Sequence, residues 1–228
     1  MSVATKLVEL LQVRRKPVAV AFCKTAPQGI PRIAAAAPSG CTYWKYAADG
    51  RTFYTEAPDH YGCSVGAYVH GIDLPNEQAK ELEGLVSTMV SLQYLDPEEV
   101  TGIPRRQGGF NVVVYAPLSD ATFEPDVVLV SGTAKQMMLL AEAAHSAGVA
   151  NETSMVGRPT CAAIPTVLQS GRSTTNLGCI GNRVYTELAD DELYFVFAGP
   201  QLDAIVEKLV TIVNANHELE TFHHARIP

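Results

Sequence analysis

The sequence predicts an α/β or α+β protein with two structurally similar halves that pack as one body around mixed sheets. Three observations support this class. Helical and strand patterns are mixed in both halves, and the block at 16–28 (KPVAVAFCKTAPQ) aligns without gaps with the block at 124–136 (EPDVVLVSGTAKQ). Each half also carries a Cys followed later by a Gly-Cys segment with a second glycine close behind, Gly-Cys-Ser-Val-Gly at 62–66 and Gly-Cys-Ile-Gly at 178–181. We expect half-repeats at 1–110 and 111–228 in one compact domain, because no Gly/Ser-rich or charged linker separates them.

In the first half, helices are predicted where apolar residues recur at intervals of three and four. Strands are predicted where β-branched and aromatic residues gather. Asn76 is expected to cap the clearest helix. The expected elements are a helix at 3–15, a strand at 18–22, a loop at 26–40, a strand at 51–56, a turn and short helix within 62–71, and a helix at 76–95.

The second half repeats this mixture of patterns. Gly148 is expected to end a helix, in the position that glycine favours. The expected elements are strands at 111–118 and 126–130, a helix at 133–147, strands at 183–188 and 193–198, and an amphipathic helix at 200–216.

Composition excludes some classes of function. The chain has 228 residues, 47% of them hydrophobic, and a net charge of −7, which argues against nucleic acid as the main partner. No apolar run reaches the roughly 18–20 residues of a membrane helix. The first residues lack the apolar core of a signal peptide, so we expect a cytoplasmic protein.

Five cysteines are the main functional signal. A reducing compartment disfavours structural disulfides, which leaves metal ligands, a reactive thiol or buried apolar thiols. Cys23 ends an apolar strand and is expected to be a buried thiol. If the halves are related by a twofold axis, two cysteines from each meet at one site that suits iron–sulfur or zinc ligation. The four expected ligands are Cys41, Cys63, Cys161 and Cys179.

The spacings within the pairs are 22 residues (63 − 41) and 18 residues (179 − 161). Because a short Cys-x-x-Cys loop is lacking, the fold itself has to assemble the site. Glycines beside two of the cysteines free the backbone to turn and to present N–H groups to a cluster or an anion. These expected cofactor-binding glycines are Gly62, Gly66, Gly178 and Gly181.

Other polar residues near the cysteines are candidates for catalysis. Arg51, Arg172 and Arg183 lie beside Gly-rich turns, where an arginine either binds a carboxylate or phosphate or forms a surface ion pair. His60 is a candidate proton donor or replacement ligand, and a loop histidine with satisfied hydrogen bonds is the plainer interpretation. Aromatic residues between 43 and 68 either line a ligand pocket or pack in the core.

The chain resembles a prokaryotic family known as domain-of-unknown-function family 169. The resemblance lies in PVAVAF at 17–22, YTEAPDHYGCSVGAY at 54–68 and GCIGNRVYTELADDELYFVF at 178–197, and it covers most of the chain. It implies that the two Gly-Cys segments belong together as signature elements. No activity follows from the family name.

The favoured hypothesis is an iron–sulfur protein of the four-iron type with a redox or small-anion-converting role. If it is an enzyme, it is an iron–sulfur oxidoreductase or lyase. One alternative is a non-catalytic module that binds zinc or a small molecule, and another is a thiol-dependent enzyme that uses Cys63 or Cys179. The expected partners are a small anionic molecule or a redox partner, without nucleic acid or membrane, in a possible homo-oligomer.

Overall fold

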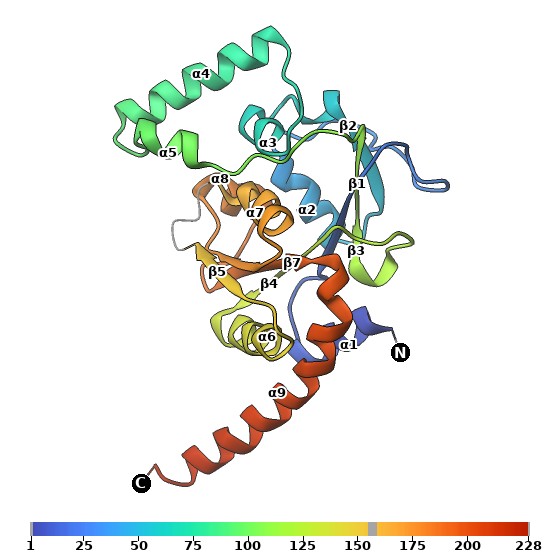
Figure 1. Cartoon of the computed structure of the whole chain (residues 1–228), viewed down its shortest axis with the longest axis vertical. Coiled ribbons are helices and arrows are strands. Elements are labelled where there is room, and N and C mark those ends of the chain that lie inside the picture. Colours follow the sequence, from blue (N-terminus) through green and yellow to red (C-terminus); the bar gives the residue numbers. More distant parts are fainter. Residues whose placement is uncertain (1, 155–158, 228) are drawn as a thin grey trace.

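The fold is built on one mixed seven-stranded sheet, shown in Figure 1. The computed structural model describes residues 2–154 and 159–227. The strand order is β2-β3-β1-β4-β7-β6-β5, and every neighbouring pair is antiparallel except β5–β6. The strands are β1 Val18–Cys23, β2 Phe53–Glu56, β3 Val112–Pro117, β4 Val127–Thr133, β5 Asn151–Ser154, β6 Ser173–Asn176 and β7 Glu192–Ala198.

Helices cover both faces of this sheet. On one face lie α2 (Gly40–Ala48), α3 (Ser64–Val69), α7 (Ala163–Ser170) and α8 (Ile180–Thr186). On the other lie α1 (Val3–Leu11), α6 (Ala134–Ser146) and the first half of α9 (Leu202–His224). The remaining elements are α4 Asn76–Ser91, α5 Pro97–Gly102 and the 3-10 helices η1 Ala57–His60, η2 Leu118–Asp120, η3 Thr160–Ala162 and η4 Gly199–Gln201.

The strands supply both cores because successive side chains point to opposite faces of a sheet. In β1, Val18 and Val20 pack on the side of α2 and α7, whereas Ala19 packs on the side of α1, α6 and α9. Tyr115 and Phe195 are fully buried on these two opposite sides. Helices on both faces therefore account for the nearly continuous apolar runs of the central strands.

On either side of the central β1–β4 pair, the next strand outward is the last of its group in the chain and the one beyond it comes earlier in the chain; β5, at one edge, has no counterpart among the described strands. β1 and β4, which carry the aligned blocks, pair antiparallel with Val20 opposite Val127. Outward from this pair come β3 and then β2 on one side, and β7 and then β6 on the other. β3 thus lies with β1 and β2, although the expected boundary at 110/111 assigns it to the second half. The similarity of the two halves and their boundary stay predictions.

Most expected elements are confirmed. The first helix ends earlier than expected, at Leu11, and the last one continues to His224. Gly148 adopts φ +80° after α6, as expected for a glycine that ends a helix. The confirmed elements are β1, β2, β3, β4, β7, α1, α3, α4, α6 and α9.

Two expectations are wrong. Residues 183–188 were expected as a strand, but 180–186 form α8. Asn76 is already the first helical residue of α4, and Pro75 holds the N-cap position. The pattern analysis also missed α2, α5, α7, β5 and β6, which are short.

Helix α4 projects from the body of the molecule (Figure 1). Every one of its residues is at least partly exposed, including the apolar positions that indicated a helix. Within the described ranges, no helix combines the length and the apolar character that crossing a membrane requires.

Candidate functional site

The four expected cysteine ligands lie on four short elements of one face of the sheet. Cys41 is in the first turn of α2, and Cys161 is within η3. Cys63 and Cys179 hold the N-cap positions of α3 and α8. Because α2 packs against α3 and α8, and α3 contacts η3, the elements form one contiguous group. We call these four residues the four-cysteine site.

Electrostatic effects show that the four thiols are neighbours. Burial raises the pKa of Cys161 well above its ordinary value, and the thiols of Cys41, Cys63 and Cys179 raise it further. Burial likewise raises the pKa of Cys41 to about 12, with further increases from Cys63 and Cys179. Cys23 is separate, because its pKa is raised by burial and by Asp126 instead. The structure therefore brings together the two cysteines of each half.

Two hydroxyl groups connect the cysteine segments. The Ser39 hydroxyl accepts a hydrogen bond from the Cys41 N–H at 3.3 Å and donates to the Cys63 Sγ at 3.9 Å. The Thr160 hydroxyl accepts from the Cys179 N–H at 2.6 Å. In each half, a hydroxyl just before the first cysteine bonds to the second one: Ser39, before Cys41, bonds to Cys63, and Thr160, before Cys161, bonds to Cys179.

Three of the four expected glycines have a steric role. A Cβ on Gly66 would lie 3.0 Å from the Cys63 Sγ, and one on Gly62 would lie 3.1 Å from the Ala37 carbonyl oxygen. Gly178 has φ +79°, which disfavours a side chain. At Gly181 an added Cβ would meet none of the described atoms within 4 Å. The absence of a side chain at Gly66 therefore leaves room for a cysteine sulfur.

Two buried polar groups lie beside the four-cysteine site, the Tyr115 hydroxyl on β3 and the Asn182 amide on α8. Burial raises the pKa of Tyr115 well above its ordinary value, with contributions from Tyr43, Cys41, Cys161 and Cys63. The Asn182 amide lowers the pKa of the Cys41 thiol through a side-chain hydrogen bond. The Tyr115 hydroxyl has no hydrogen-bond partner among the described residues. Since buried polar groups are normally hydrogen-bonded, this hydroxyl is placed to donate to something held by the thiols.

The candidate arginines lie elsewhere. Arg51 lies just after the C-terminal end of α2, whereas Cys41 is in the first turn of that helix. The Arg51 guanidinium stacks 4.4 Å from the centre of the Tyr46 ring. Arg172 is exposed and precedes β6, whereas Cys179 follows that strand. Arg183 donates hydrogen bonds to the carbonyl oxygens of Leu177, Ala189 and Glu192 at 2.6–3.0 Å. Its guanidinium therefore stabilises the ends of α8 from within the chain.

His60 is buried behind Tyr43, with the two ring centroids 5.2 Å apart. Its Nε2 lies 2.7 Å from the Thr55 hydroxyl, and burial lowers its pKa to about 4. The imidazole is therefore neutral near pH 7. The Cys63 N–H donates a hydrogen bond to the His60 carbonyl oxygen at 3.0 Å, and Tyr43 interacts electrostatically with Cys63.

The geometry of the site bears on the kind of metal it suits. Among the residues that the structure describes, no group of three or more His, Cys, Asp or Glu side chains is close enough to hold a metal ion. Four thiolates bound to one zinc ion at 2.3 Å would lie about 3.8 Å from one another. In a four-iron cluster each thiolate binds a different iron, so the sulfurs stand farther apart.

Sequence patterns did not identify Tyr115, Asn182, Ser39 or Thr160. Asn182 does follow Cys179 by three residues, and its N–H donates to the Cys179 Sγ at 3.5 Å, which is the spacing of a helix cap. Tyr115 is the one hydroxyl-bearing residue in the apolar run 112–117. These two local signals identify both residues only when the cysteines are already suspected.

Comparison with known proteins gives a family without an assigned activity. The model of the family described as "Uncharacterised ArCR", domain of unknown function 169, matches residues 6–208. An uncharacterized protein of Methanocaldococcus jannaschii is 27% identical over 217 residues, which cover 90% of this chain and 91% of that protein. No solved structure matches the chain.

Proposed function

Because this chain belongs to the Uncharacterised ArCR family, whose description assigns no activity, we propose a function from its own residues. The four-cysteine site holds an iron–sulfur cluster of the four-iron type, and the protein serves in electron transfer. The observation that carries this proposal is the convergence of four thiols beside the Tyr115 hydroxyl, which is buried without a hydrogen-bond partner among the described residues.

The two buried thiols can ionise only beside a compensating positive charge. Cys41 and Cys161 are buried, and the pKa of each is raised, so their thiols stay protonated near pH 7 unless a positive charge compensates the thiolates. Metal binding supplies that charge and releases the protons. A reactive-thiol enzyme needs the opposite, a lowered pKa, so neither buried thiol suits nucleophilic chemistry.

Each surrounding residue then has a definite role. When bound, a cluster of this type accepts and donates electrons at a potential set by its surroundings. Cys41 and Cys161 exclude water, whereas Cys63 and Cys179 are partly exposed and form the outer edge. The Tyr115 hydroxyl would be placed to donate a hydrogen bond to sulfur of the bound group, as the Asn182 amide does to Cys41, and such hydrogen bonds would stabilise a more negative state of that group. Gly66 leaves the space that the Cys63 sulfur needs.

The decisive experiment is iron and acid-labile sulfide analysis of anaerobically purified protein, with Cys→Ser variants. We expect about four irons and four sulfides per chain and broad absorption near 400 nm, as a four-iron cluster requires. Cys41→Ser, Cys63→Ser, Cys161→Ser and Cys179→Ser should each lower the iron content. The matched control is Cys23→Ser, which should retain it, because Cys23 lies on β1 away from the site. Stoichiometric zinc, or iron-free protein, would contradict the proposal.

A pair of glycine substitutions tests the same site without removing a ligand. Gly66→Ala should make the cluster more labile to oxygen and chelator, because its Cβ would crowd the Cys63 Sγ at 3.0 Å. Gly181→Ala is the control, since its Cβ has no described neighbour within 4 Å. Both positions are helical, so both gain about the same helix propensity. Equal cluster lifetimes in the two variants would argue against a cluster at Cys63.

A further inference from the structure

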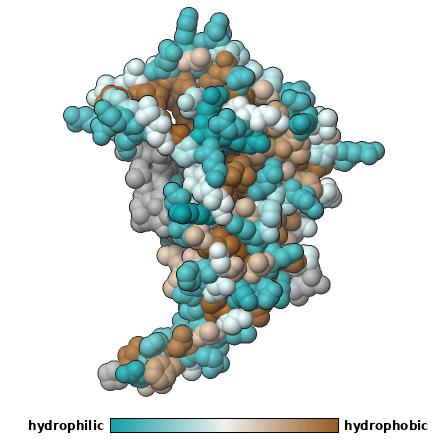
Figure 2. All heavy atoms as spheres, viewed as in Figure 1, coloured by the Kyte–Doolittle hydropathy of each residue, from teal (hydrophilic) through white to brown (hydrophobic). Residues whose placement is uncertain are grey.

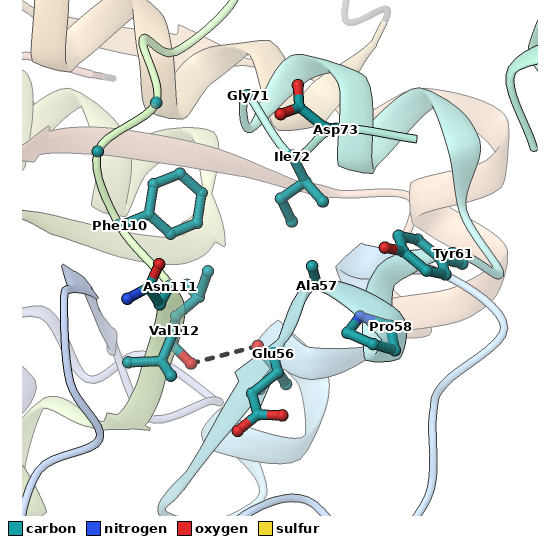
Figure 3. A pocket seen from close by; sticks show the side chains of 14 residues that line it. Glu56, Ala57, Pro58, Tyr61, Gly71, Ile72, Asp73, Phe110, Asn111 and Val112 are labelled. Carbon is teal, nitrogen blue, oxygen red and sulfur yellow. Dashed lines mark hydrogen bonds between the residues drawn. The ribbon is translucent and has the colours of Figure 1, made fainter. Parts of the chain in front are cut away.

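A cavity of about 490 Å³ lies at the end of α3 opposite Cys63, between the end of β2, η1 and the segments 71–73 and 108–113 (Figure 3). Its volume is within the range of small-molecule sites. We propose that this cavity binds a small planar molecule that is uncharged. The inference is independent of the iron–sulfur proposal, because none of the lining residues described is a cysteine.

A close backbone approach builds one wall of the cavity. Gly71 has φ +78°, and a Cβ there would lie 2.3 Å from the Arg106 carbonyl oxygen. The Arg106 N–H also donates a hydrogen bond to the Val69 carbonyl at 2.8 Å. A side chain at position 71 would push the segments around Gly71 and Arg106 apart. Because glycine allows their contact, the chain forms this wall without help from a ligand.

Aromatic and apolar side chains and one hydroxyl line part of the cavity. Figure 3 shows the Phe110 ring across the space from Ile72 and Ala57, with the Tyr61 hydroxyl directed toward it. The Phe110 ring is held by an edge contact with Phe22, at 5.0 Å between centroids. A rigid ring beside apolar side chains favours a flat ligand that stacks, and Tyr61 adds one hydrogen bond.

The charges of the wall select the ligand's charge. Among the described lining residues the ionisable ones are Glu56, Asp73 and Tyr61, and no Lys, Arg or His lines the cavity. Glu56 forms an ion pair with Arg32 at 2.9 Å, and its carboxylate points away from the space in Figure 3. Asp73 is exposed at the rim, 3.6 Å from the Arg105 guanidinium. Both carboxylates are therefore paired with an arginine, and the Arg106 guanidinium stacks 4.4 Å from the centre of the Phe110 ring. A ligand charge of either sign would meet no uncompensated opposite charge, so the wall favours a neutral ligand.

The test uses three probes that share one pyridine ring and differ in charge: nicotinamide, 1-methylnicotinamide and nicotinate. Each is titrated into isotope-labelled full-length protein and followed by the amide NMR signals of Ile72 and Phe110. We expect nicotinamide to bind about tenfold more tightly than either charged probe. Tightest binding by nicotinate or 1-methylnicotinamide, or no binding by any probe at millimolar concentration, would overturn the proposal.

Variants locate the binding. Phe110→Ala should weaken nicotinamide binding about tenfold by removing the stacking surface. The matched control is Phe222→Ala, which removes an exposed ring on α9. Should Phe110→Ala fail to fold, Tyr61→Phe removes only the hydroxyl and should weaken binding of nicotinamide severalfold. Unchanged affinity in the folded Phe110 variant, or in Tyr61→Phe, would contradict a site in this cavity.

Discussion

The buried polar residues beside the four-cysteine site are harder to predict from the sequence than the cysteines. The Tyr115 hydroxyl has no hydrogen-bond partner among the residues described and the Asn182 amide contacts Cys41, and only weak local signals mark either residue in the sequence. The cysteines themselves could be predicted, because the repeated Gly-Cys segments mark them. Their surroundings could not, since a strand pattern does not tell which cross-strand group a hydroxyl will face.

A buried histidine gives a prediction of pH dependence. His70 is fully buried, and neither of its ring nitrogens has a partner among the described residues. Burial lowers its pKa to about 3, with smaller effects from His60 and Arg106. The unfolded chain takes up a proton near pH 6.5 while the folded protein does not. The free energy of unfolding therefore falls as the pH drops from about 6.5 toward 3, by at most about 1.4 kcal/mol per pH unit for this residue.

His70→Phe should remove that slope. Urea denaturation at pH 7, 6 and 5 should show a smaller loss of stability in the variant than in the wild type. At pH 7 the variant should be within about 1 kcal/mol of the wild type or more stable, because an unpaired polar group becomes apolar. The exposed His145 provides the control, and His145→Gln should keep the wild-type slope. An unchanged slope in His70→Phe would refute a neutral buried imidazole.

At the scale of elements, periodicity predicted the long segments and failed for short ones. Residues 183–188 alternate and contain β-branched and aromatic types, which favours a strand locally. They form a helix because Cys179 caps it and Arg183 bonds to carbonyls beyond both of its ends.

Helix α4 shows the converse case. Its pattern gave the right structure, but the pattern does not tell whether a core lies against that face, and here every residue keeps some exposure.

The arginine bonds around α8 can be tested directly. Arg183→Met should lower the free energy of unfolding by about 2 kcal/mol, because several carbonyl groups lose a charged donor. Arg172→Met is the matched control. It removes an exposed guanidinium and should change stability by less than about 0.5 kcal/mol. Urea denaturation followed by far-UV circular dichroism measures both. Equal stabilities would leave Arg183 free for the anion-binding role suggested by its sequence context.

At the scale of the whole molecule, the sheet separates two hydrophobic cores. The four-cysteine site lies in the core shared by α2, α3, α7 and α8, and the opposite core lies under α1, α6 and α9. Figure 2 shows polar side chains over most of the face in view, with smaller apolar areas between them. The antiparallel pairing of β1 with β4 at the centre brings the cysteine segments of both halves to the same face.

This division predicts where cofactor loading will stabilise the chain. α3 and α8 have six and seven residues, too few to be stable alone, and each begins at an expected ligand, Cys63 or Cys179. Their amide hydrogens should therefore exchange by local opening in iron-free protein and at least tenfold more slowly after reconstitution. The helix α6, on the other face, has thirteen residues and its own core, so its local exchange should change little. Hydrogen exchange of reconstituted and iron-free protein measures this, with Cys161→Ser as a control that should show no slowing.

Equal slowing in α6 and α8 would mean that the two faces open as one unit. Slowing confined to α6 would contradict a cofactor at the four-cysteine site, because α6 lies on the opposite face of the sheet.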